Sequence, residues 1–144
     1  MKKIIALVVL LCALTISSTA KAAKWENIGG GLESIWEIDK SSVSYDKNNY
    51  EEIIFHAFFK EINNITPPYD NILNPYKHSN RPAYSIYSIF FKESGNLKYV
   101  SIASSAHYEF DGSVISSNSH PTNFAPIPPD SLGEMLFYAA YNRL

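Results

Sequence analysis

The side chains that could carry chemistry are few and scattered along this chain of 144 residues. The only cysteine, Cys12, lies in an apolar run at the amino terminus and offers no nucleophile to a folded domain. The chain has no Gly-x-Ser-x-Gly elbow and no phosphate-binding glycine loop. Four histidines lack the paired spacing of metal ligands: His56, His78, His107 and His120. The sequence therefore predicts no catalytic residue, no metal site and no bound cofactor.

Aromatic residues are what the chain has in excess, with ten tyrosines and eight phenylalanines. Tyrosine supplies contact area while remaining compatible with water. For tyrosines in expected strands, such as Tyr84, β-propensity explains the choice equally well. The interval 63–82 differs, because prolines and asparagines interrupt any period, and long connections of this kind are usually functional or disordered. We predict a protein-binding site there, made by Tyr69, Tyr76, His78 and Arg81.

The first 22 residues are typical of a signal peptide. Lys2 and Lys3 precede an apolar run over residues 4–16, which is too short to span a bilayer. Small residues ending at Ala22 offer a cleavage site. An uncleaved membrane anchor is the alternative, and the leucines before Cys12 disfavour a lipoprotein. We predict cleavage after Ala22, no stable membrane span afterwards, and an exported protein in the periplasm or at the outer cell surface.

Cleavage would change the balance of charge. Of 144 residues, 122 would remain, enough for one domain, residues 23–144, with a modest core. Loss of Lys2, Lys3 and Lys21 reduces the basic residues from 12 to 9 against 14 acidic residues, a net charge of −5. An acidic domain is a poor partner for nucleic acid or anionic lipid. With Cys12 removed, the domain would also fold without a disulfide.

Alternation of apolar residues predicts several strands. Two short ones flank the glycine run 29–31, and longer ones cover residues 51–62, 84–91 and 97–110, with a last short strand at 114–115. Asp111-Gly112 predicts a type I′ hairpin turn. In the strand at 97–110, strict alternation places Val100 and Ile102 on one face and Ser105 and His107 on the other.

A helix is expected at the carboxyl terminus. Ser131 followed by Glu134 forms a capping box after a proline-rich segment. The expected apolar face comprises Leu132, Met135, Leu136 and Ala139. Because so short a helix is marginal alone in water, it must pack on the strands. The expected fold class is α+β, an antiparallel meander sheet of about six strands with one C-terminal helix packed on one face.

Three segments resemble the bacterial surface-adhesin protein E family: Trp25–Ile28, Ile38–Val43 and Ile127–Glu134. The resemblance implies an antiparallel sheet with a terminal helix and a non-enzymatic exported protein that adheres to host matrix or serum proteins. The family commonly has one cysteine at the strand end matching Phe91 and another near Tyr141. Both positions are aromatic here, so we expect the two rings to replace a disulfide and to lie within about 7 Å.

The sequence thus predicts an exported binding protein that engages another protein through the interval 63–82 and exposed aromatic residues. The alternative is a periplasmic structural or accessory domain with no host partner. An enzyme would require a cleft with convergent titratable groups.

Overall fold

The computed structural model describes residues 22–45, 52–63 and 82–144. The four predicted binding residues Tyr69, Tyr76, His78 and Arg81 lie outside these ranges, as does nearly all of the expected signal peptide.

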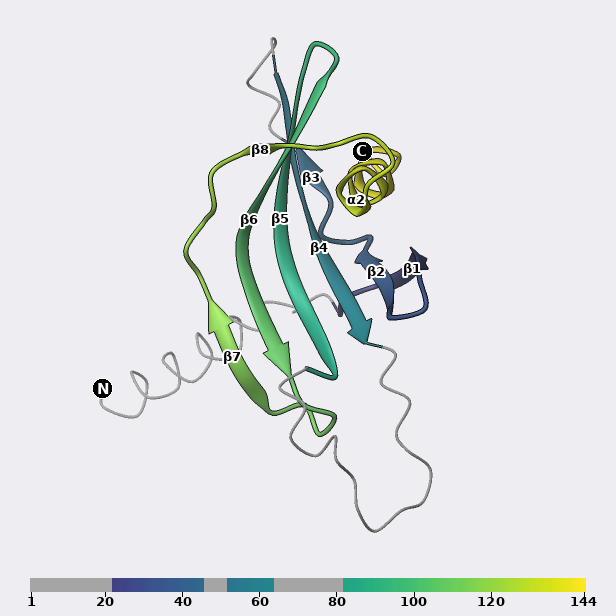
Figure 1. The fold of residues 1–144 in the computed structure, drawn as a ribbon, viewed down its shortest axis with the longest axis vertical. Helices are drawn as coiled ribbons and strands as arrows, with labels where there is room; N and C mark the ends of the chain where they lie inside the picture. The colour runs from purple at the N-terminus through teal and green to yellow at the C-terminus, as the bar shows by residue number, and fades with distance from the viewer. Residues whose placement is uncertain (1–21, 46–51, 64–81) are drawn as a thin grey trace, which may run out of the picture.

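The strands form one antiparallel sheet in meander order, β1-β2-β4-β5-β6-β7 (Figure 1). This six-strand path agrees with the sequence prediction, and two further strands of two residues bring the total within the described ranges to eight. The strand bounds are β1 Trp25–Gly30, β2 Ser34–Asp39, β3 Ser44–Tyr45, β4 Ile53–Asn63, β5 Tyr84–Ser94, β6 Leu97–Tyr108, β7 Val114–Asn118 and β8 Ala125–Pro126.

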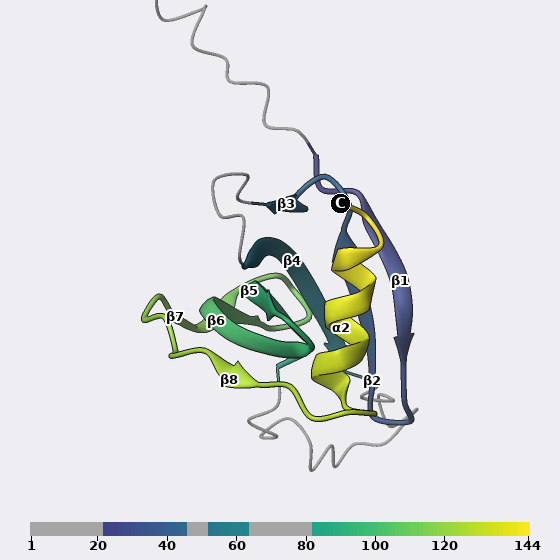
Figure 2. The same ribbon diagram turned by 90° about the horizontal axis from the view of Figure 1, so that it is seen from above.

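The single described helix, α2 (Leu132–Tyr141), lies across the concave face of the sheet (Figure 2). Its predicted cap is confirmed, because the Ser131 hydroxyl accepts a hydrogen bond from the Glu134 amide at 3.2 Å. The Glu134 carboxylate reaches back one residue further than a capping box requires and accepts the Asp130 amide at 2.8 Å. Among the described residues, no helix is both long and apolar enough to cross a membrane.

The buried face of α2 overlaps the predicted one only in part. Leu136 is buried, and Met135 and Ala139 are partly buried against the core, as predicted. Leu132 is 47% exposed instead, and the prediction missed Phe137 and Ala140, which are buried. It missed them because nearly every position in this helix is apolar, so spacing alone fits more than one face.

An aromatic cluster joins the helix to the sheet. Phe137 contacts Phe55 of β4 at 5.0 Å and Phe91 of β5 at 5.7 Å between ring centroids. Tyr141 contacts the same Phe55 at 5.9 Å and Phe137 at 5.6 Å. Phe91 and Tyr141 therefore lie on the same side of the sheet, as the resemblance implied, and both pack against Phe55 and Phe137. The ring contacts among the described residues do not include the expected direct one between Phe91 and Tyr141.

The β6–β7 hairpin is present, but its turn is not type I′. Gly112 has a φ of +84°, whereas Asp111 is not among the residues with positive φ. The Gly112 amide donates to the Glu109 carbonyl, and the Glu109 amide donates to the Ser113 carbonyl. This is the pattern of a type I turn followed by a glycine bulge, in which only one residue needs the left-handed conformation. The Asp111 side chain accepts the Ser113 amide, which favours this turn.

Candidate functional site

A β-bulge in β6 decides which side chains share the concave face. Ile89 of β5 pairs with Ile102, but Ser88 pairs with Ser104, so the register shifts by one residue between them. The shift brings Ile102 and His107 to the same face, although strict alternation predicted opposite faces. The small residues around Ala103 leave room for this shift, but their pattern does not specify where the bulge occurs.

Beside the helix, the concave face is hollowed into an apolar cavity of about 500 Å³. Its floor comes from the central strands, one wall comes from the amino-terminal end of α2, and the other comes from the segment that contains β8. Trp36 and Tyr87 stack on this floor with ring centroids 5.6 Å apart. The apolar lining residues are Trp36, Tyr87, Ile89, Val100, Ile102, Ala125, Leu132 and Leu136.

Thr122 fixes the wall that contains β8. Its amide donates to the Ile102 carbonyl, and its hydroxyl accepts the Ile102 amide, both at 2.9 Å. The Ser101 hydroxyl donates to the Thr122 carbonyl at 2.6 Å. These three hydrogen bonds hold the segment against β6 through both side-chain and backbone groups, in place of the regular backbone hydrogen bonds between two strands. The wall is therefore positioned by the fold before any ligand binds.

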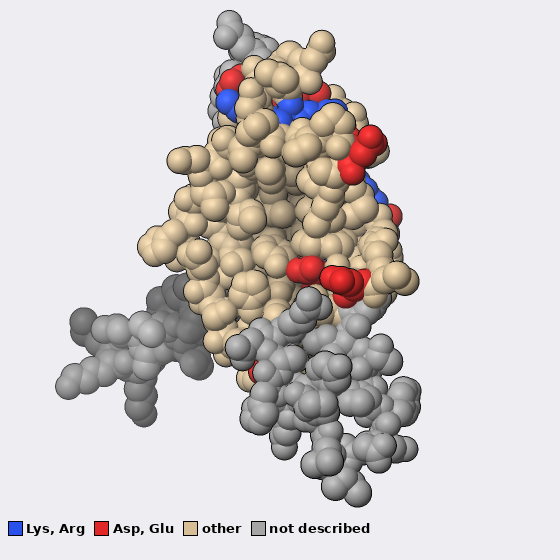
Figure 3. All heavy atoms as spheres, viewed as in Figure 1, with Lys and Arg blue, Asp and Glu red and all other residues tan. Residues whose placement is uncertain are grey.

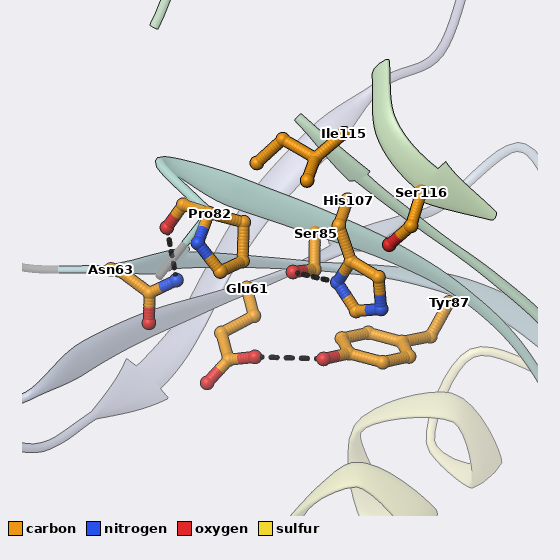
Figure 4. Close-up of a pocket in the computed structure, with 8 residues that line it drawn as sticks. All are labelled: Glu61, Asn63, Pro82, Ser85, Tyr87, His107, Ile115 and Ser116. Carbon is orange, nitrogen blue, oxygen red and sulfur yellow. Dashed lines mark hydrogen bonds between the residues drawn. The ribbon is translucent and has the colours of Figure 1, made fainter. Parts of the chain in front are cut away.

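A second cavity of about 330 Å³ adjoins the first and is polar (Figure 4). Two hydrogen-bonded pairs lie on its floor: the Tyr87 hydroxyl donates to Glu61 at 3.0 Å, and Ser85 bonds His107 Nδ1 at 2.8 Å. Burial raises the pKa of Tyr87 to about 12, so the phenol stays protonated and remains a donor. Figure 4 shows Ile115 of β7 on the opposite side of this cavity.

The two cavities are neighbours, because Glu61 and Tyr87 line both of them. Figure 3 shows this face of the molecule: uncharged side chains cover its middle, and acidic side chains gather near its lower end. We refer to the combined feature as the concave trough.

The serine of the Ser85–His107 pair in the concave trough is buried. A serine that is hydrogen-bonded to a histidine has two of the groups of a nucleophilic catalytic site. Ser85, however, is only 1% exposed, so its hydroxyl lies beneath the surface that a substrate would reach. The described residues contain no group of three or more His, Cys, Asp or Glu side chains placed to hold a metal ion.

The predicted binding interval and the concave trough meet at the polar end. Asn63 and Pro82, the two ends of the interval 63–82, both line the polar cavity. The Asn63 side chain donates to the Pro82 carbonyl at 2.7 Å and so holds these ends together. The residues that form the rest of the trough, above all Trp36, Tyr87 and Ile102, were missed because pairing across the sheet, rather than local sequence, brings them together.

The opposite, convex face carries a smaller aromatic group. His56 packs between Phe58 and Phe90, with centroid distances of 5.0 and 4.7 Å, and bonds the Ser88 hydroxyl at 2.8 Å. His56 is therefore a packed, hydrogen-bonded histidine. Phe58 and Phe90 are 39% and 38% exposed.

In comparisons with known proteins, no protein-family model matches the chain, and no curated protein or solved structure is significantly similar to it.

Proposed function

We propose that this protein is an exported, non-enzymatic binding protein that receives a segment of another protein in the concave trough. The observation that carries the proposal is the trough itself. Its volume lies in the range of ligand-binding cavities, and its lining combines apolar and aromatic side chains with a few hydrogen-bonding groups. Long paired strands and the helix hold these side chains in place, so little conformational entropy is lost on binding.

The shape favours an extended segment over a compact metabolite. The trough follows β5 from Ile89 to Ser85, a distance of about 13 Å at the usual rise per strand residue. An extended peptide of about four residues spans that length. Alternate side chains of such a peptide would face the apolar floor, a common mode of peptide recognition.

The resemblance to the surface-adhesin protein E family supports an extracellular host protein, of the matrix or serum class, as the partner. The alternative is a periplasmic accessory domain that uses the same trough for a bacterial protein. Intact mass of protein from the producing cell tests export, because cleavage after Ala22 removes residues 1–22. Proteolysis of intact cells then separates the two locations, since only a surface protein is accessible to the added protease.

Two matched substitutions test the site. Ile102 lines the trough and is 38% exposed, whereas Phe58 lies on the convex face and is 39% exposed. Each is replaced by Glu, and binding to a panel of purified extracellular-matrix and serum proteins is measured by surface plasmon resonance. We expect Ile102→Glu to abolish binding of the partner that the wild type recognises and Phe58→Glu to preserve it. The reverse pattern in folded variants would move the site to the convex face.

A further inference from the structure

Glu61 is a glutamate of β4 that lines the trough, and it forms no ion pair with any described lysine or arginine. In the described part of the chain, Lys40, Lys60, Lys92, Lys98 and Arg143 each form an ion pair with a glutamate other than Glu61. Within the same ranges, the one polar contact of the Glu61 carboxylate is the bond that it accepts from the Tyr87 hydroxyl.

Glu61 is also the only lysine, arginine, aspartate or glutamate among the described residues that line the two cavities. The other titratable groups that face the polar end among the described residues are Tyr87, which donates to Glu61, and His107, which bonds Ser85. Among the described residues, the lining of the trough therefore has an apolar end, next to α2 and β8, and one carboxylate, Glu61, where it turns polar. A half-buried carboxylate next to apolar walls is poorly screened by water, so it attracts a cation more strongly than an exposed one does.

Resting on the proposed function, we infer that the trough selects an apolar group followed closely by a cation, such as a hydrophobic side chain next to a lysine or arginine in the partner. The apolar group would lie over Ile89, Val100 and Ile102, and the cation would pair with Glu61. An acidic segment would meet repulsion from Glu61 and from the net negative charge of the domain.

Three fluorescent probes with the same dansyl group and the same alkyl tail test the inference. Dansylcadaverine ends in an amine, the dansyl derivative of aminohexanoic acid ends in a carboxylate, and dansyl pentylamide is uncharged. Affinity is measured by fluorescence anisotropy with the full mature domain. At low salt we expect the amine to bind on the order of tenfold more tightly than the carboxylate, with the uncharged probe between them and the difference shrinking as salt increases.

Matched variants show which residues cause the preference for the amine and which ones bind the apolar part of the probe. Glu61→Gln keeps an acceptor for the Tyr87 hydroxyl but removes the charge, so the preference for the amine should fall to about twofold or less. Glu93→Gln changes a glutamate of β5 that lines neither cavity and should leave the preference intact. Ile102→Glu on the floor should weaken binding of the uncharged probe, and so should Leu132→Glu on the wall formed by α2, where an acid in the first helical turn is tolerated.

Equal affinity for the amine and the carboxylate, or a preference that survives Glu61→Gln, would overturn this inference. Unchanged binding of the uncharged probe to both Ile102→Glu and Leu132→Glu would also overturn it, because the probe would then bind outside the trough. The proposed function fails separately, when Ile102→Glu leaves capture of the partner protein unaffected. Loss of partner binding in Ile102→Glu without any charge preference would refute only the selection by Glu61.

Discussion

Replacing Phe137 by Ala should be among the most damaging single substitutions in the helix. Phe137 is 0% exposed and packs against the rings of Phe55, Phe91 and Tyr141 at centroid distances between 5.0 and 5.7 Å. Truncating such a ring removes its transfer free energy and leaves a cavity that rigid aromatic neighbours fill poorly, a loss of about 3–5 kcal/mol. Because a domain of this size is stable by only about 5–15 kcal/mol, the variant should be close to the limit of folding.

Tyr138→Ala provides the matched control. Tyr138 is the next residue in the same helix and is 44% exposed, so its truncation should cost less than about 1.5 kcal/mol. Replacing Phe or Tyr by Ala raises the intrinsic helix propensity by nearly the same amount. The difference between the two losses in free energy of unfolding therefore reports how tightly each side chain is packed. Urea unfolding followed by circular dichroism measures both, and the unfolding midpoint should shift at nearly constant slope. In thermal melts the difference corresponds to roughly 3–6 °C per kcal/mol.

The reasoning would be refuted if Phe137→Ala cost no more than Tyr138→Ala. That result would mean that packing of the helix on the sheet contributes little to the free energy of unfolding, and that the sheet is stable with its concave face uncovered. A large loss for Phe137→Ala together with unchanged binding to the trough would instead separate the stabilising role of α2 from its role as a wall.

Two further predictions concern the helix cap and the convex face. Ser131→Ala removes the acceptor for the Glu134 amide and should lower the free energy of unfolding by about 1 kcal/mol, measured by urea unfolding. Burial lowers the pKa of His56, so the unfolded chain binds its proton more readily than the folded domain does. Stability should therefore be complete above about pH 6.5 and should fall as the pH decreases through that value. His56→Gln should flatten this dependence between about pH 7 and about pH 5, whereas the exposed His120→Gln should not; equal slopes in both variants would contradict the assignment.

Much of the architecture followed from local chemistry. The long strands, the hairpin at Asp111-Gly112 and the Ser131 cap were predictable because alternation, turn residues and capping residues act over a few positions. The details that failed were also local. The buried face of α2 was ambiguous in a helix that is apolar nearly all round, and the turn type depended on whether Asp111 or only Gly112 adopted positive φ.

The candidate site was decided by the tertiary structure. Trp36, Glu61, Tyr87 and Ile102 come from four different strands, and no sequence spacing relates them. A single bulge in β6 moves Ile102 to the face of Tyr87, because a one-residue slip exchanges the two faces of a strand. The sequence alone therefore determined which segments become strands and helix, whereas register and packing across the sheet determined which of their side chains face one trough.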